Sequence, residues 1–212
     1  MNFDLPTSIY EELHQDDGYR PNIGIVLMNR FGKVLWARRA SRDGWQFPQG
    51  GIQRNESLED ALFRELHEEV GLADHQVNML AHTSGWLRYD LPGHYRRRVR
   101  PQRRGAPFRG QKQIWCLLAL LDHDSEVCLS ATRKPEFDKW IWTDWWSAVQ
   151  QIVDFKRPVY ESVWSELNPF LSSYINFWFP ERGGSKPDTE TDASDGSRPI
   201  HSTNSVKTPS SR

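Results

Sequence analysis

Three glutamates occupy neighbouring turns of one predicted helix. Ser57, with an acidic residue three positions later, has the pattern of a helix N-cap, and Gly71 is typical of a C-terminal stop. At about 100° per residue, Glu65 and Glu69 fall within or at the edge of the apolar stripe of this helix, with Glu68 beside them. The stripe is formed by Leu58, Leu62, Phe63, Leu66 and Val70. Carboxylates that face a core need a specific partner.

A divalent cation is the partner that this pattern favours. Hard carboxylate oxygens at this density suit Mg²⁺ or Mn²⁺, which keep bound waters and bridge to phosphates. Zn²⁺ is disfavoured because the seven histidines are scattered and no His or Cys pair accompanies the glutamates. A solvated acidic face with Arg64 as partner is the alternative. Against it, Asp60, Arg64 and His67 already fall on the opposite side of the helix, which we expect to face solvent.

The same stretch resembles a family motif, the Nudix box: Gly, five residues, Glu, seven residues, then Arg-Glu-aliphatic-x-Glu-Glu-x-Gly-aliphatic. The matching residues are Gly50, Glu56, Arg64, Glu65, Leu66, Glu68, Glu69, Gly71 and Leu72. Nine fixed positions in 23 residues make chance agreement very improbable. The resemblance implies a loop-helix-loop that binds divalent metal and hydrolyses a nucleoside diphosphate linked to another moiety. Its implied metal ligands are Glu65, Glu68, Glu69 and the Gly50 carbonyl, and Arg64 would orient a glutamate.

Short blocks across residues 16–164 resemble bacterial RNA pyrophosphohydrolases, which remove pyrophosphate from triphosphorylated 5′ RNA ends and are similar to dinucleoside-polyphosphate hydrolases. The blocks include DDGYRPN, WQFPQGGI, GQKQ and PEFDKW. The implied substrate is 5′-triphosphorylated RNA, with dinucleoside polyphosphates as the alternative and Mg²⁺ or Mn²⁺ as the cofactor. By motif position, Glu136 resembles the family's distal carboxylate, a metal ligand or base. Taken without the resemblance, a Glu after Pro135 would be an ordinary loop residue.

The resemblance also implies contacts to RNA. Positions that would contact the 5′ phosphates or the first nucleotides are Arg20, Arg39, Tyr89, Lys112 and Lys156, and a base would pack on Val153 and Phe155. Without the resemblance, the cations would be surface charges and Phe155 a core residue. Gly44 departs from the pattern, because a serine is expected there. A backbone amide would have to replace the lost hydroxyl contact.

An arginine-rich segment lies between two predicted strands. Seven arginines fall within residues 96–109, although the chain has a formal net charge of -1. Such a local basic patch favours a polyanion as partner, and RNA that continues past the 5′ end would gain from counterion release. A solvated loop is the alternative interpretation.

The elements that must position these residues follow from hydrophobic periodicity. Strands are expected at 22–29, 33–38, 77–82, 86–89, 112–121 and 140–142, the first two as a hairpin, and further helices at 145–152 and from 158 to about 171. Strands interleaved with helices and followed by helices predict an α/β protein. The expected architecture is an α/β/α sandwich around a mixed β-sheet, which is also the Nudix fold.

Composition bounds the folded domain. We expect an N-terminal extension at 1–15, the hydrolase domain at 16–180 and a disordered tail at 181–212, which is rich in Ser, Thr, Asp, Pro and Gly. The N-terminus lacks the pattern of a signal peptide, no run of 18 apolar residues occurs, and Cys116 and Cys128 lack disulfide-framework spacing. These features favour the cytoplasm. A catalytically silent binding module is disfavoured because every carboxylate of the box is present.

Overall fold

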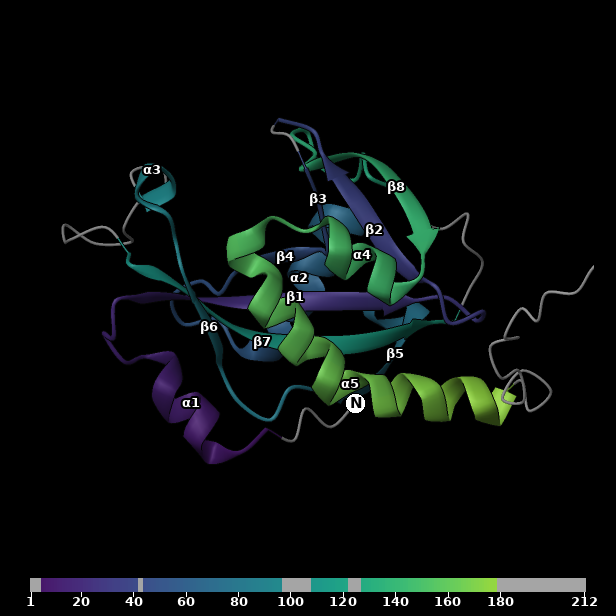
Figure 1. Cartoon of the computed structure of the whole chain (residues 1–212), viewed down its shortest axis with the longest axis horizontal. Helices are drawn as coiled ribbons and strands as arrows, with labels where there is room; N and C mark the ends of the chain where they lie inside the picture. The colour runs from purple at the N-terminus through teal and green to yellow at the C-terminus, as the bar shows by residue number, and fades with distance from the viewer. Residues whose placement is uncertain (1–4, 42–43, 97–107, 122–126, 179–212) are drawn as a thin grey trace, which may run out of the picture.

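The computed structural model describes residues 5–41, 44–96, 108–121 and 127–178 (Figure 1). Its elements, in chain order, are α1 (Thr7–Leu13), β1 (Tyr19–Met28), β2 (Val34–Arg39), β3 (Trp45–Gln46), β4 (Gln49–Gly51), α2 (Leu58–Val70), η1 (Asp74–Gln76), β5 (Val77–His82), β6 (Leu87–Asp90), α3 (Gly93–Arg96), β7 (Gly110–Leu120), β8 (Phe137–Thr143), α4 (Trp145–Gln151), η3 (Asp154–Lys156) and α5 (Arg157–Trp178). Every helix and strand expected from the sequence is present.

The strands form a mixed sheet, as predicted. Its path runs β3-β2-β1-β7-β5, while β4 pairs with β1, β6 with β7 and β8 with β2. The central pair, β1 and β7, is parallel over ten residues, from Tyr19 opposite Gly110 to Met28 opposite Ala119. The other pairs are antiparallel, including the predicted β1–β2 hairpin, in which Met28 lies opposite Val34.

Alternate residues of the central strands enter two separate cores, as the two-residue period of a strand requires. Ile23, Ile25 and Ile114 pack with α1 and α2 on one face of the sheet. Val26 and Trp115 pack with α4 and α5 on the other. Helices therefore cover both faces (Figure 1), and the predicted α/β/α sandwich is confirmed.

Helix α5 is longer than the sequence predicted. It begins at Arg157 and ends at Trp178, and it continues through Pro169. Proline removes one backbone hydrogen bond and bends a helix, and the axis of α5 changes direction in Figure 1. The last turns are held by packing, because Ile175 lies directly against Gly32 in the β1–β2 turn, where φ is +74°. Tertiary contact thus extends the helix beyond the expected end.

The N-terminal segment packs onto the domain. Leu5, Ile9 and Leu13 are buried in the same core as α2, and the Trp86 indole N–H donates to the Ile9 carbonyl at 3.1 Å. The predicted tail and most of the arginine-rich segment lie outside the described residues.

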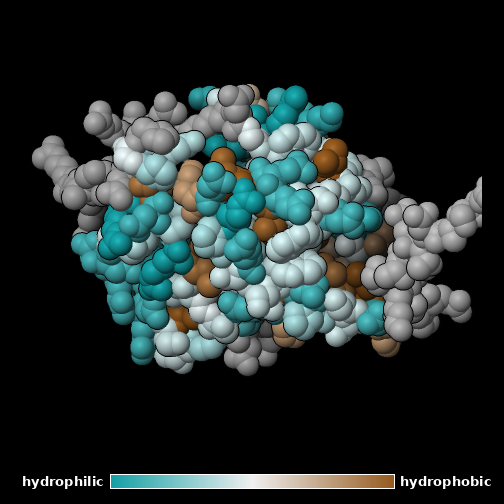
Figure 2. Space-filling model, viewed as in Figure 1, coloured by the Kyte–Doolittle hydropathy of each residue, from teal (hydrophilic) through white to brown (hydrophobic). Residues whose placement is uncertain are grey.

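The surface over α4 and α5 mixes hydrophilic residues with small groups of hydrophobic ones (Figure 2). Within the described ranges, no helix has the length and apolar character that crossing a membrane requires.

Candidate active site

Helix α2 is fixed at both ends by the residues that the sequence indicated. The Ser57 hydroxyl accepts the Asp60 N–H at 3.0 Å and donates to the Asp60 carboxylate at 2.7 Å. Gly71 ends the helix with φ at +74°, a conformation that favours glycine. These caps set the register of the helix and hence the direction of its glutamates.

Two of the three glutamates are buried. Glu65 and Glu69 are only 7% and 3% exposed, whereas the side chain of Glu68 is 47% exposed. Burial, aided by the neighbouring Glu136 and Glu65, raises the pKa of Glu69 well above its usual range, against a backbone hydrogen bond from Gln49. Burial also raises the pKa of Glu65, against the nearby Arg64 guanidinium. The predicted inward direction therefore holds for two glutamates.

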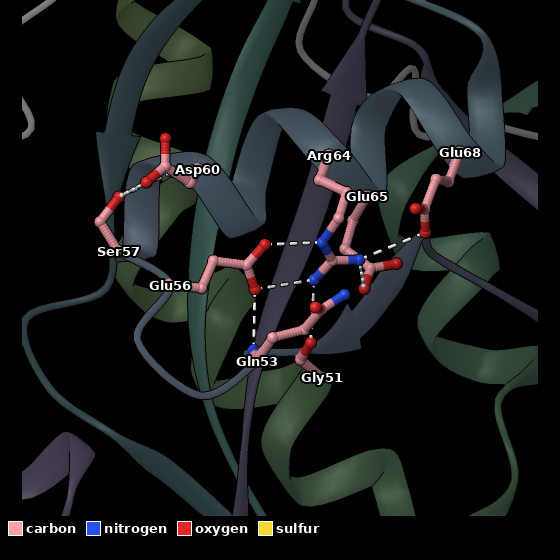
Figure 3. A network of polar contacts seen from close by, with 8 residues as sticks. All are labelled: Gly51, Gln53, Glu56, Ser57, Asp60, Arg64, Glu65 and Glu68. Carbon is pink, nitrogen blue, oxygen red and sulfur yellow. Dashed lines mark hydrogen bonds and ion pairs between the residues drawn. The ribbon is translucent and has the colours of Figure 1, made fainter.

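Arg64 does not face solvent, and that prediction was wrong. Its side chain is 21% exposed and reaches around the helix, as a long guanidinium side chain can. Nε and Nη2 donate to the two carboxylate oxygens of Glu56 at 2.6 and 2.9 Å, and Nη1 donates to Glu65 at 2.6 Å and Glu68 at 3.2 Å (Figure 3). Nη2 also donates to the Gly51 carbonyl at 3.0 Å. One guanidinium thus joins the loop before α2 to two glutamates of the helix.

The two glycines of β4 allow this close packing. A Cβ on Gly50 would overlap the Glu65 carboxylate, and a Cβ on Gly51 would overlap the Arg20 guanidinium. Gly50 and Gly51 are adjacent in β4, which pairs with β1. The side chain that Gly50 lacks leaves room for Glu65, and the one that Gly51 lacks leaves room for Arg20. The Gly50 position of the box is therefore a steric requirement of this site.

Glu69 and Glu136 meet from distant parts of the chain. Glu69 Oε2 accepts the Gln49 N–H at 2.8 Å, while its buried Oε1 has no hydrogen-bond partner among the described residues. Glu136 precedes β8, and its carbonyl accepts the Ala40 N–H at 2.8 Å beside a bulge in the β2–β8 pairing. Bulges re-aim neighbouring side chains, and here Glu136 comes close enough to raise the pKa of Glu69 and of Glu65.

An open pocket of about 410 Å³ lies at this point. Its lining residues, which we call the acidic pocket, are Glu65, Glu68, Glu69, Thr132, Arg133, Lys134 and Glu136. The size falls in the range typical of small-ligand sites. The sequence predicted the four glutamates, but it did not single out residues 132–134, because nothing in a short loop segment shows which cavity it borders.

Five predicted RNA contacts form a second group beside the carboxylates. This cation–aromatic group comprises Arg20, Arg39, Tyr89, Phe155 and Lys156. Burial lowers the pKa of Arg20 against the attraction of Glu65 and Glu136. Burial, then the nearby Arg39, lowers the pKa of Lys156 to about 7, against the attraction of Glu136 and Glu69.

The rings of this group are arranged around Lys156. The ammonium lies 5.8 Å from the centroid of the Tyr89 ring and donates to Gln46 at 3.2 Å. The Phe155 ring lies between Tyr89 and Tyr95, with centroids 5.9 and 5.2 Å away. Tyr95 was not singled out from the sequence, since its position on the short helix α3 follows only from the fold.

Of the two other predicted contacts, Lys112 stands apart from this group. Lys112 lies opposite Arg88 in the β6–β7 pairing, whereas Tyr89 lies opposite Gln111, so Lys112 and Tyr89 point to opposite faces of the sheet. The Lys112 ammonium is fully buried against the N-terminal segment, where it donates to the carbonyls of Glu12 at 2.5 Å and Gln15 at 3.5 Å and to Asp17 at 3.1 Å. Val153 is 40% exposed before η3.

Comparison with known proteins decides the family. The model of the NUDIX domain matches residues 18–163, more than half of the chain. The chain belongs to the Nudix family. Nudix hydrolases act on phosphoanhydrides and generally use divalent metal ions.

Solved structures share the Nudix fold at low sequence identity. The E. coli dihydroneopterin triphosphate pyrophosphohydrolase is 20% identical with a TM-score of 0.53, covering 71% of this chain and 98% of that one. A C. elegans Ap4A hydrolase in a binary complex is 18% identical with a TM-score of 0.52, covering 71% and 99%. A Nudix hydrolase from Listeria monocytogenes is 19% identical with a TM-score of 0.50, covering 73% and 95%.

The Nudix glutamates fit a divalent metal by their chemistry. The donor set is all oxygen, and the buried Glu69 Oε1 is a carboxylate oxygen that lacks a partner among the described residues. Among the described residues, no group of three or more His, Cys, Asp or Glu side chains has the arrangement of a formed metal site. Arg64 lies between Glu65 and Glu68 instead. An all-oxygen donor set suits a hard divalent cation, which completes its shell with water and substrate oxygens.

The departure at Gly44 has a conformational cause. Its φ is +107°, a region that L side chains rarely adopt, so a serine would be strained on this backbone. Its carbonyl accepts the Arg39 N–H at 3.1 Å, which holds the loop beside the cation–aromatic group.

Proposed function

We propose that this Nudix hydrolase removes pyrophosphate from the 5′-triphosphate end of RNA, leaves a 5′-monophosphate and thereby promotes transcript degradation in the cytoplasm. The observation that carries the proposal is the cation–aromatic group beside the acidic pocket. It combines guanidinium and ammonium donors, which suit phosphate oxygens, with the partly buried Phe155 ring, on which a base can stack. A phosphorylated 5′ nucleotide needs both.

Binding is assigned to the cation–aromatic group. Arg20, fixed against Gly51, and Arg39, whose buried Nε has no partner among the described residues, would donate to the 5′ phosphates. Lys156 would join them, because an anion bound nearby favours its protonated form. Phe155 and the exposed Val153 would pack against the base. Lys112 is left out of this assignment because its donors are used by the N-terminal segment.

Catalysis is assigned to the acidic pocket. A divalent metal would be held by Glu65, Glu68, Glu69, Glu136 and the Gly50 carbonyl, and when bound it neutralises phosphate oxygens and activates water. Water then forms the new P–O bond, the bridging P–O bond breaks, and pyrophosphate departs. A carboxylate of the pocket takes the proton of the water. Arg64 keeps Glu65 and Glu68 in place through hydrogen bonds of 2.6 and 3.2 Å.

Dinucleoside polyphosphates are the second candidate substrate. One fold neighbour is a C. elegans Ap4A hydrolase, and the same cations would bind the phosphate chain of a dinucleotide. The seven arginines within residues 96–109 favour RNA, because a polyanion longer than a dinucleotide can bind more of them. Most of these arginines lie outside the described residues.

Competition between the two substrates tests the proposal. Purified protein is given 5′-triphosphorylated RNA and diadenosine tetraphosphate, each with and without Mg²⁺, and released pyrophosphate, phosphate and mononucleotides are identified. We expect a higher kcat/KM on the RNA, pyrophosphate as its product and no turnover after chelation of the metal. A higher kcat/KM on the dinucleotide would transfer the assignment to the second candidate.

A charge variant of the arginine-rich segment refines this test. Changing Arg96, Arg97, Arg98 and Arg100 to Ala should weaken binding of RNA several nucleotides long and flatten its salt dependence, because fewer counterions are released. Turnover of diadenosine tetraphosphate should change little, since its short phosphate chain offers few charges beyond those that the cation–aromatic group would bind. Equal losses on both substrates would contradict a role in binding RNA beyond its 5′ end.

A further inference from the structure

The acidic pocket also contains two cations. Arg133 and Lys134 line it together with the four glutamates, on the loop that leads to Glu136 and β8. Neither cation makes an ion pair or hydrogen bond to any residue in the described part of the chain, although four carboxylates line the same pocket. Cations beside carboxylates that they do not pair with remain available to an incoming anion.

The cation–aromatic group and the pair Arg133 and Lys134 differ in burial and in their relation to the pocket. Arg20 and Lys156 are mostly buried and are attracted by the Glu136 carboxylate, but they do not line the acidic pocket. Arg133 and Lys134 are exposed, and no aromatic residue is among those that line their pocket. The first group suits a nucleotide with its phosphate, whereas the second offers only charge. Glu69, with its buried unpartnered oxygen, lines the pocket and also attracts the Lys156 ammonium of the first group.

We propose that Arg133 and Lys134 form the binding site for the pyrophosphate group that leaves during the reaction. This inference rests on the proposed pyrophosphohydrolase function, because it divides the polyphosphate chain between the two cationic groups. The phosphate that stays on the nucleotide lies with Arg20, Arg39 and Lys156. The departing phosphates extend into the open pocket, where Arg133 and Lys134 offset the negative charge of the glutamates and the product can exit directly to solvent.

Inorganic pyrophosphate is the probe, because its binding requires no RNA. Calorimetric titration with and without Mg²⁺ compares the wild type with Arg133→Gln/Lys134→Gln, which removes both charges and keeps polar side chains. Each exposed ion pair contributes modestly, so we expect binding to weaken by roughly 3- to 10-fold. Arg30→Gln/Lys139→Gln is the matched control, since it removes two exposed cations that do not line the pocket, and it should bind like the wild type.

A charge-preserving swap completes the experiment. Arg133→Lys/Lys134→Arg should keep pyrophosphate affinity within about 2-fold of the wild type, because the acidic pocket retains both positive charges. Equal affinity of the wild type and the Gln variant, or no measurable pyrophosphate binding by the wild type, would overturn the inference. Pyrophosphate binding that depends on the two cations, in a protein that does not hydrolyse triphosphorylated RNA, would keep this site and reject the proposed RNA substrate.

Discussion

Two clusters in this protein join a cation from one element to oxygen acceptors elsewhere in the chain. Lys112 is fully buried, and two carbonyls and the Asp17 carboxylate accept its hydrogen bonds. Arg64 likewise satisfies Glu56, Glu65 and Glu68, but the adjacent Glu69 keeps a buried carboxylate oxygen without a partner in the described structure. The first cluster is complete, whereas the second has capacity left for a ligand.

This difference separates a structural cluster from a functional one. An unsatisfied buried carboxylate oxygen costs free energy unless a ligand uses it, while a satisfied cluster only stabilises the fold. Outside the candidate site, the unpartnered buried side-chain groups of the described residues are four tryptophan N–H groups and Gln113 Oε1. Those groups are neutral, whereas the two charged groups with an unpartnered buried atom in the described residues, Glu69 and Arg39, both belong to the candidate site.

The largest expected effect is the loss of turnover in Glu69→Gln. Removing this charge should lower kcat by about 10²- to 10³-fold, as removal of one preorganised electrostatic group does elsewhere. The melting temperature should hold or rise, because burial already disfavours the charge. Steady-state kinetics at saturating Mg²⁺ and thermal unfolding provide the measurements. Glu59→Gln, on the same helix but outside the pocket, is the control, and near wild-type turnover by Glu69→Gln would refute its assigned role.

Lys112→Met should lower stability and leave turnover unchanged. It breaks a buried charge cluster and should destabilise the fold by about 3 kcal/mol, while kcat of the remaining folded protein stays close to the wild type. Urea unfolding and kinetics are compared with Lys139→Met, an exposed lysine on β8. A lower kcat with an unchanged urea midpoint would return Lys112 to the substrate site that the sequence suggested.

Arg64→Lys should lower both kcat and the free energy of unfolding, each by a smaller amount. An ammonium cannot reproduce the fork that binds both Glu56 oxygens while also reaching Glu65 and Gly51. We expect kcat to fall by about 10-fold and the free energy of unfolding by about 1 kcal/mol. If kinetics and thermal unfolding both matched the wild type, the charge of Arg64 alone would suffice and its geometry would be irrelevant.

The smallest effect is a pH dependence at Asp17. Partial burial raises its pKa, but hydrogen bonds from the Tyr19 N–H and Lys112 outweigh burial and hold the pKa below its ordinary value of 3.8. The contribution of Asp17 to stability is therefore present above pH 3.8 and is lost as pH falls through the lower folded-state pKa. Urea midpoints of the wild type and Asp17→Asn should differ at pH 7 and converge below pH 3.8. A constant difference would contradict the linkage.

The sequence predicted what depends on local spacing. The caps of α2, the inward direction of Glu65 and Glu69, the β1–β2 hairpin and the mixed sheet all follow from periodicity and turn residues. Glu136 was found only through resemblance, because its closeness to Glu69 depends on pairing between β2 and β8.

Long-range geometry accounts for what the sequence did not predict. Arg64 was placed on the solvent face because a helical wheel locates Cβ atoms and not the end of a long side chain. Lys112 was grouped with Tyr89 although strand alternation across β6 and β7 separates them. The length of α5 depends on Ile175 meeting Gly32, which is a contact between the two ends of the domain.

The parallel pairing of β1 with β7 also has a consequence for folding during synthesis. Tyr19 and Gly110 are about 90 residues apart, so a large loop must close before the central sheet exists, and such non-local pairing forms slowly. The ribosome completes α2 and its glutamates well before it reaches β7 and Glu136. We therefore expect a nascent chain that stalls before β7 to carry the entire Nudix box without the central strand pair and without Glu136.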